Sequence, residues 1–181
     1  EKIYREEWRP WVGEKYARTR HNAGRIALSQ FVSVCGGSWI DSSKYVGQVW
    51  KGTVAGREVV GLLPETFMNE SGGSVKKMVT NKAHAKELVV LYDDIDLPLG
   101  TMRVSFDRGS GGHNGIKSIV DNIGTEAFAR IRIGISPLRD GVIKKPKGAP
   151  AVLKWVLGDF TKTEEKKLHD GALRVGDLIE H

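Results

Sequence analysis

The stretch Gly109-Ser110-Gly111-Gly112-His113-Asn114-Gly115 is followed at once by a segment with helical periodicity. In that segment apolar residues recur at i, i+3, i+4 and i+7, namely at Ile116, Ile119, Val120 and Ile123. The sequence therefore predicts a glycine-rich loop, whose backbone can approach a ligand closely, running into the N-terminus of an amphipathic helix. The N–H groups and the dipole at such a terminus favour an anionic or polar ligand. The simpler interpretation is a capped turn, with Asn114 as the N-cap residue.

The composition is typical of a globular protein, with 40% apolar and 28% charged residues. A chain of 181 residues can bury a sizeable core, so we expect one domain spanning residues 1–181. No apolar run approaches the roughly 18 residues of a membrane span, and residues 1–7 lack the apolar core of a signal peptide. With a single cysteine, these features predict a cytoplasmic protein without a membrane partner. The net charge of +6 is compatible with a polyanionic partner such as nucleic acid.

Strands and helices are expected to alternate on both sides of the glycine-rich loop. The predicted strands are residues 45–54 and 58–63, which form a hairpin, and residues 88–92, 102–106 and 130–135. The continuous apolar run at 88–92 is typical of a parallel strand that is buried on both faces. This order predicts the α/β class, as a three-layer α/β/α sandwich around a mixed, mostly parallel sheet.

Helices are expected after Asn22, after Asn69 and near the C-terminus, as well as after the glycine-rich loop. The helix near the C-terminus begins with a capping box formed by Thr161 and Glu164. Cys35 falls on the apolar stripe of the first helix, so we expect its side chain to be buried.

Polar clusters follow several of the predicted strands. Residues 66–69 follow one strand, Asp93, Asp94 and Asp96 follow another, and His21 begins the first helix. Ligands bind outside the carboxyl ends of strands in open α/β sheets, so we expect these groups to gather at one edge. A histidine base, a carboxylate that fixes its tautomer and amide groups that stabilise an oxyanion together support hydrolysis by direct attack of water.

Each of these groups also has a structural interpretation. His21 can be an ordinary helix-start residue, Asn69 a helix cap and Met68 a core residue. The three aspartates can be turn formers, or they can bind Mg²⁺ in a metal-dependent phosphoesterase. The five histidines show no zinc spacing.

A series of motifs occurs in a fixed order over residues 19–158. The motifs are Thr19-Arg20-His21-Asn22-Ala23-Gly24, Thr66-Phe67-Met68-Asn69 with Ser71-Gly72, Asp93-Asp94 with Asp96-Leu97-Pro98 and Gly100, Gly111-Gly112-His113-Asn114-Gly115, Arg130 with Arg132-Ile133-Gly134-Ile135, and Val156-Leu157-Gly158. Together they resemble the bacterial-type peptidyl-tRNA hydrolase family. The resemblance implies a monomeric α/β/α sandwich that cleaves the ester between a peptide and the tRNA 3′ end. It also implies that the protein needs no metal, no cofactor and no obligate protein partner.

The resemblance further implies roles for individual residues. His21 is the general base that activates water, and Asp93 orients it. Asn69 and Asn114 bind the peptide–ribose end of the substrate, and the cleft is lined by Tyr16, Met68 and His113. Contacts with tRNA phosphates, which weaken as salt rises, are expected from Arg103, Lys117, Arg130, Arg132, Lys144, Lys145 and Lys147. The three lysines at 144–147 belong to a basic segment, residues 138–150, which is expected to be a mobile loop.

The N-terminus departs from the family pattern. The family opens with an apolar strand and a Gly-Leu-Gly-Asn-Pro-Gly loop whose asparagine contacts the substrate, whereas this chain reads Trp8-Arg9-Pro10-Trp11-Val12-Gly13. Trp11 stands in place of that asparagine, which makes residues 1–13 atypical. The family also usually continues beyond the position of His181. The alternative hypothesis is therefore a non-catalytic RNA-binding protein derived from the same fold, against which the intact catalytic set argues.

Overall fold

The computed structural model describes residues 16–180, so the atypical segment 1–13 with Trp11 lies outside the described residues. Contacts divide the chain into two compact units. Among the described residues, the first unit comprises residues 16–17, 37–89 and 106–129, and the second comprises residues 18–36, 90–105 and 130–180. The expectation of one domain over the whole chain stays a prediction.

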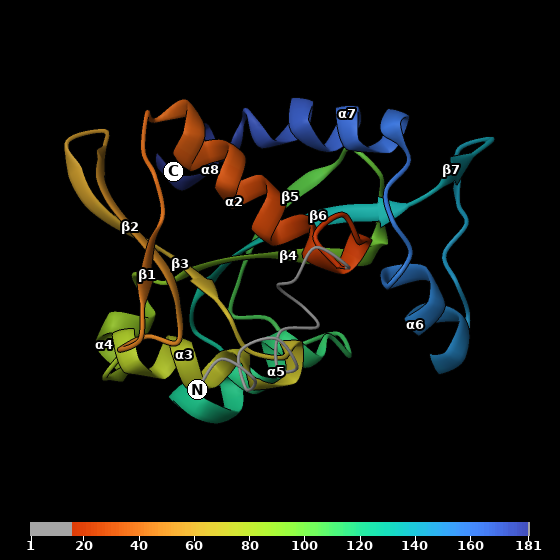
Figure 1. Ribbon diagram of the computed structural model, residues 1–181. Helices are drawn as coiled ribbons and strands as arrows, with labels where there is room; N and C mark the ends of the chain where they lie inside the picture. Colours follow the sequence, from red (N-terminus) through yellow and green to blue (C-terminus); the bar gives the residue numbers. More distant parts are fainter. Residues whose placement is uncertain (1–15, 181) are drawn as a thin grey trace, which may run out of the picture. The chain divides into compact units, whose positions relative to one another are not determined.

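The first unit contains an antiparallel sheet in the order β1-β2-β3. Its strands are β1 (Ile40–Ser42), β2 (Gly47–Val54) and β3 (Arg57–Pro64). Ala55 and Gly56 connect β2 to β3, and both have positive φ angles (49° and 78°), as a tight two-residue hairpin turn requires. The predicted hairpin is thus confirmed, and it is drawn in gold in Figure 1.

Short helices complete the first unit: η2 (Met68–Glu70), α3 (Ser71–Met78), α4 (Lys82–Ala85) and α5 (Asn114–Ile123). α5 packs against η2 and α3 (Figure 1). The approach is close because a Cβ on Gly72 would lie 2.1 Å from the backbone oxygen of Ser118. The buried apolar residues of this unit are Val49, Trp50, Leu63, Val75, Val79, Ala85, Ile116, Ile119 and Phe128.

The second unit is built on a sheet in the order β4-β6-β5. Its elements, some of whose end residues fall in the first unit, are η1 (Arg20–Asn22), α2 (Ala23–Val34), β4 (Val89–Pro98), β5 (Met102–Phe106), β6 (Ala129–Ser136), β7 (Leu138–Arg139), β8 (Val142–Ile143), α6 (Ala149–Val156), α7 (Lys162–Ala172) and α8 (Val175–Glu180). β4 and β6 run in the same direction, because Ala129 N donates to Leu88 O at their starts and Leu99 N donates to Ser136 O at their ends. None of the helices described for residues 16–180 is long and apolar enough to cross a bilayer.

Helix α2 packs against α7 and α8 in the second unit (Figure 1). The apolar face of α2 contributes Ala27, Phe31 and Val32 to the core. The other buried apolar residues of this unit are Ala23, Tyr92, Leu97, Ile131, Ile133, Ile135, Val156, Phe160, Leu168, Ala172 and Val175. The predicted capping box is confirmed, since Thr161 and Glu164 exchange side-chain-to-backbone hydrogen bonds at the start of α7.

The α/β class is confirmed, but several details differ from the sequence-based expectations. The pairs β1–β2, β2–β3 and β7–β8 are antiparallel, so antiparallel pairing predominates among the described strands. The run at 88–92 is largely half-buried rather than enclosed on both faces. The expectation that Cys35 is buried was wrong: this residue caps the C-terminus of α2, where the helix leaves the core, and is exposed. Residues 138–150 contain the β7–β8 hairpin and the start of α6.

Candidate active site

The second unit brings together His21 and Asp93, which are 72 residues apart in the sequence. The Nδ1 atom of His21 lies 2.9 Å from both Oδ1 and Oδ2 of Asp93. The carboxylate side chain is 3% exposed and the imidazole 11% exposed. A short polar contact at this level of burial fixes both side chains tightly.

Glycine at position 24 allows this contact to form. A Cβ at Gly24 would lie 2.1 Å from the backbone oxygen of Leu91, so the first turn of α2 rests directly on the backbone of β4. His21 lies one turn before Gly24, and Asp93 lies two residues after Leu91. The close crossing of η1–α2 over β4 therefore sets the distance between the two functional groups.

The contact with Asp93 indicates where the imidazole proton lies when the carboxylate is ionised. An ionised carboxylate only accepts hydrogen bonds, so Nδ1 of His21 carries the proton and Nε2 is the basic nitrogen. Burial lowers the pKa of His21, but the charge of Asp93 and the hydrogen bond to it outweigh burial and raise the pKa above its ordinary value of 6.5. The imidazole is therefore a stronger base than an exposed histidine.

The aspartates occupy strand β4 rather than a turn, so the interpretation as turn formers was wrong. Successive residues of a strand point to opposite faces, which separates Asp93 from Asp94 and Asp96. Asp94 accepts a hydrogen bond from Arg132 Nε at 2.7 Å, and Asp96 pairs with Lys145. Each carboxylate thus has a different protein partner, and β4 does not present the three of them as one set of Mg²⁺ ligands.

In the first unit, Met68 and His113 lie together over the start of α5. A Cβ on Gly115 would lie 2.6 Å from Met68 Sδ and 3.0 Å from His113 Cε1, so a larger residue at this position would have to displace these side chains. Nδ1 of His113 accepts a hydrogen bond from Ile116 N at 3.3 Å. His113 is therefore the N-cap residue of α5, which corrects the expectation that Asn114 caps it; Asn114 is the first helical residue.

Asn69 and Asn114 are both exposed, on η2 and at the beginning of α5. η2 and α5 pack against each other, so the first unit places the two asparagines on neighbouring elements. Neither amide side chain has a hydrogen-bond partner among residues 16–180. Two exposed amides without partners in this part of the chain can bind a ligand without first breaking a hydrogen bond to it. Tyr16 is half-buried at the beginning of the described chain.

The basic residues fall into two groups. Arg103, Lys117, Lys144, Lys145 and Lys147 are exposed. Arg130 is fully buried and Arg132 is 8% exposed, with the guanidinium of Arg132 paired to Asp94. A contact with a phosphate needs a donor that faces solvent, so burial favours a role inside the protein for these two arginines.

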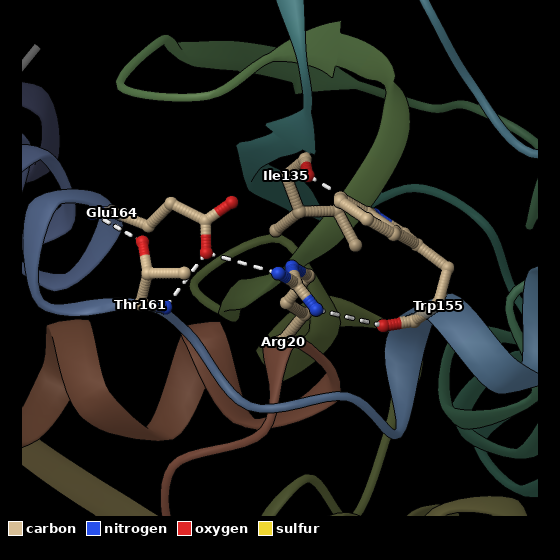
Figure 2. A network of polar contacts seen from close by, with 5 residues as sticks. All are labelled: Arg20, Ile135, Trp155, Thr161 and Glu164. Atoms are coloured by element: carbon tan, nitrogen blue, oxygen red, sulfur yellow. Dashed lines mark hydrogen bonds and ion pairs between the residues drawn. The ribbon is translucent and has the colours of Figure 1, made fainter.

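Sequence reasoning gave no place in the functional site to Arg20, Trp155 or Glu164, which belong to the network in Figure 2. Nη2 of Arg20 donates to Glu164 Oε2 at 2.9 Å, and its guanidinium stacks 3.8 Å from the ring centroid of Trp155. Glu164 could be recognised only as a helix cap, because its contact with Arg20 spans 144 residues. The signal in the sequence that could have pointed to this network is the position of Arg20, directly before the candidate base His21.

Comparison with known proteins places this chain in a family. The family model described as "Peptidyl-tRNA hydrolase" matches residues 12–181. The chain is 41% identical over 157 residues to the peptidyl-tRNA hydrolase of Syntrophotalea carbinolica, covering 86% of this chain and 78% of that protein. It is 37% identical over 155 residues to that of Aquifex aeolicus, covering 85% and 76%.

Solved structures show the same relationship. The crystal structure of peptidyl-tRNA hydrolase from Acinetobacter baumannii matches with a TM-score of 0.81 and 31% identity, over 93% of this chain and 82% of that one. The family model covers all of the described residues 16–180. The chain belongs to the peptidyl-tRNA hydrolase family.

Proposed function

We propose that this protein hydrolyses the ester bond of peptidyl-tRNA, releasing peptide and tRNA, with His21 as the general base. The observation that carries the proposal is the buried His21–Asp93 pair, in which a carboxylate fixes the imidazole tautomer. A protein that only binds RNA has no need of a base whose protonation is set in this way. The alternative, a non-catalytic RNA-binding protein of the same fold, is therefore not favoured.

In the proposed reaction, Nε2 of His21 takes a proton from water as its oxygen attacks the ester carbonyl. A tetrahedral intermediate forms, and the bond between the carbonyl carbon and the ribose oxygen then breaks. The imidazolium returns its proton to the departing ribose oxygen, which leaves peptide acid and tRNA. Asp93 stays ionised throughout and stabilises the imidazolium while it exists.

Asn69 and Asn114 are proposed to bind the peptide–ribose end of the substrate, and Asn114 to hold the attacking water. Their exposure and their lack of protein partners among the described residues support this role. The N-terminus of α5 adds N–H groups and a dipole that favour negative charge on the substrate. Tyr16, Met68 and His113 are proposed to line the same cleft.

The exposed basic residues are proposed to contact tRNA phosphates. These residues face solvent: Arg103, Lys117, Lys144, Lys145 and Lys147. Each phosphate contact that they make should make the affinity for tRNA fall more steeply as the salt concentration rises. Arg130 and Arg132 are not included, because they are buried.

The proposal includes hydrolysis without a metal or a cofactor, since His21 and Asp93 supply a base and its orienting anion. We further propose that the protein acts as a monomer in the cytoplasm, where peptidyl-tRNA arises from stalled translation. The three-layer α/β/α arrangement of the sheets and helices is proposed on the strength of the family.

The direct test is release of an N-acetylated aminoacyl group from tRNA in EDTA, comparing the protein with His21→Ala. We expect cleavage by the parent and a loss of roughly 10²- to 10⁴-fold in kcat for the variant, because the base is gone. tRNA binding should persist in His21→Ala. Near-normal turnover by the variant would contradict the mechanism. No cleavage by either protein, with salt-sensitive tRNA binding intact, would instead support the non-catalytic alternative.

A further inference from the structure

Arg20 precedes His21 in η1, and its side chain is held from three sides (Figure 2). Its guanidinium stacks on the ring of Trp155 with 3.8 Å to the centroid. Nη1 donates to the backbone oxygen of Trp155 at 3.4 Å, and Nη2 donates to Glu164 Oε2 at 2.9 Å. The Arg20 side chain is only 8% exposed and that of Glu164 17% exposed, so this ion pair is largely removed from water.

The partners of Arg20 are themselves anchored to rigid elements. Glu164 Oε2 also accepts a hydrogen bond from Thr161 N at 2.7 Å, within the capping box of α7. Trp155 Nε1 donates to the backbone oxygen of Ile135 in β6 at 3.1 Å. Arg20 therefore connects the start of α2 to α6, α7 and the central strand of the β4-β6-β5 sheet.

The backbone beside Arg20 is held by the same part of the chain. Arg20 N donates to Gly158 O at 3.0 Å, and Phe160 N donates to Arg18 O at 2.9 Å. An isolated β-bridge pairs Thr19 with Asp159 between these two bonds. Residues 18–20 and 158–160 thus form a short antiparallel pairing directly before His21.

We propose that Arg20 is a positioning residue for the general base: its stack on Trp155 and its pair with Glu164 fix the η1 turn that aims His21 at Asp93. The inference rests on the proposed function. Arg20 and His21 are consecutive residues of one tight turn, so a shift of the Arg20 backbone also moves the Cα of His21. A displacement of about 1 Å in a catalytic group can cost about 100-fold in rate.

Arginine suits this position better than lysine. A planar guanidinium can stack on an aromatic face while its edge donates to a carboxylate and a carbonyl, whereas an ammonium cannot do both. Burying an ion pair is not by itself an efficient way to stabilise a fold, because desolvation offsets much of the attraction. The buried charge of Arg20 instead serves to orient the neighbouring base, His21.

Two variants disturb the network in different ways. Arg20→Lys keeps the positive charge but loses the planar stack. Gly158→Ala keeps Arg20 and adds a Cβ 2.7 Å from its Nη1, which displaces the guanidinium through the flexible end of a side chain. Gly158 has no positive φ that would strain an alanine.

Each variant has a matched control. Arg18→Lys changes the arginine two residues earlier, which makes an exposed pair with Glu165 at 2.9 Å and contacts neither Trp155 nor Glu164 in the described network. Gly176→Ala adds a methyl group elsewhere in the second unit, 3.5 Å from Phe31 at ordinary contact distance.

The first readout is steady-state ester hydrolysis well below the unfolding temperature of each variant. We expect kcat to fall about ten- to 100-fold in Arg20→Lys and Gly158→Ala, with KM changed less than about twofold. The controls should keep both constants. If kcat stays within twofold of the parent in both test variants, or if KM rises in proportion, Arg20 does not position the base.

The second readout needs no turnover. NMR titration of His21, assigned by its loss in His21→Ala, follows how well the imidazole remains paired with Asp93. We expect the His21 titration midpoint to move to lower pH in both test variants and to stay in place in both controls. An unchanged midpoint with only a lower melting temperature would show a purely structural role and overturn the inference. If instead the parent protein fails to hydrolyse the ester, the proposed function is contradicted. The NMR titration of His21 in the variants still tests whether Arg20 positions the imidazole.

Discussion

The candidate site residues of the two units differ in burial and in hydrogen bonding. In the second unit, His21, Asp93 and Arg20 are largely buried, and each is bonded to a named partner within the protein. In the first unit, Asn69 and Asn114 are exposed, and their amide side chains have no hydrogen-bond partner among residues 16–180. The difference agrees with the roles proposed for these groups. A base must have its tautomer and pKa set before the substrate arrives, whereas a binding amide keeps its hydrogen bonds for the ligand.

The two states also carry different energetic consequences. Removing one partner of a buried charged pair leaves the other without compensation, which costs about 3–5 kcal/mol in typical proteins. Removing an exposed amide without a partner costs almost nothing in the folded protein. Mutations in the two groups should therefore differ in their effects on stability as well as on activity.

The largest effect is expected from Asp93→Asn. An amide at this position can donate its N–H to Nδ1 of His21, which shifts the proton to Nε2 and removes the basic lone pair from the reacting side. We expect kcat to fall by roughly 10²- to 10⁴-fold in the hydrolysis assay. Asp170→Asn, an exposed change on α7, serves as the charge-matched control and should stay near the parent value. Retention of most of the activity in Asp93→Asn would show that the pair does not set the tautomer.

A smaller effect is expected from Asn114→Ala and Asn69→Ala. Each removes about one hydrogen bond to the substrate, worth about 1 kcal/mol, so kcat/KM should fall about fivefold. The midpoint of thermal unfolding should not change, because neither amide has an internal partner among the described residues. A clear drop in melting temperature without a change in kcat/KM would contradict the contrast between the two units.

The smallest expected effect is a shift in the pH dependence. His21 acts as a base only when neutral, so kcat/KM should rise with pH through the pKa of His21 in the free enzyme. That pKa is raised above 6.5 by Asp93, so the acid limb should have its midpoint above 6.5. In Asp93→Asn the burial that lowers the pKa remains while the charge is lost, so the residual activity should show a limb at lower pH. If the acid limb of the kcat/KM profile stays at the same pH in Asp93→Asn, the limb reports the titration of a group other than His21.

Much of the local structure was predictable because it depends on neighbouring residues. The α5 helix follows from its apolar period, the β2–β3 hairpin from alternation around a short turn, and the capping box from the Thr161–Glu164 spacing. The His21–Asp93 pair was predicted from the family resemblance and lies at bonding distance in the second unit. The roles of Asn69, Asn114 and the exposed lysines remain predictions.

Several of the differences share one physical cause, since they concern what lies opposite a residue rather than what lies beside it. Three aspartates in four residues favour a turn locally, yet strand pairing and separate partners hold Asp94 and Asp96 in β4. Cys35 has the apolar spacing of α2 but lies at its end, beyond the elements that cover the helix. The expected phosphate contact of Arg132 is disfavoured for the same reason, because its charge is paired with Asp94 inside the protein.

The sequence by itself determined the family, most of the periodic elements and the capping box of α7, and it predicted His21 and Asp93 as the base and its carboxylate. Only the tertiary structure decided which charges are buried and what holds the base in place. The Arg20–Glu164 contact joins residues 144 positions apart, and Arg132–Asp94 joins residues 38 apart. Local patterns encode backbone preference and burial on one face, but a specific long-range partner exists only once the chain has packed.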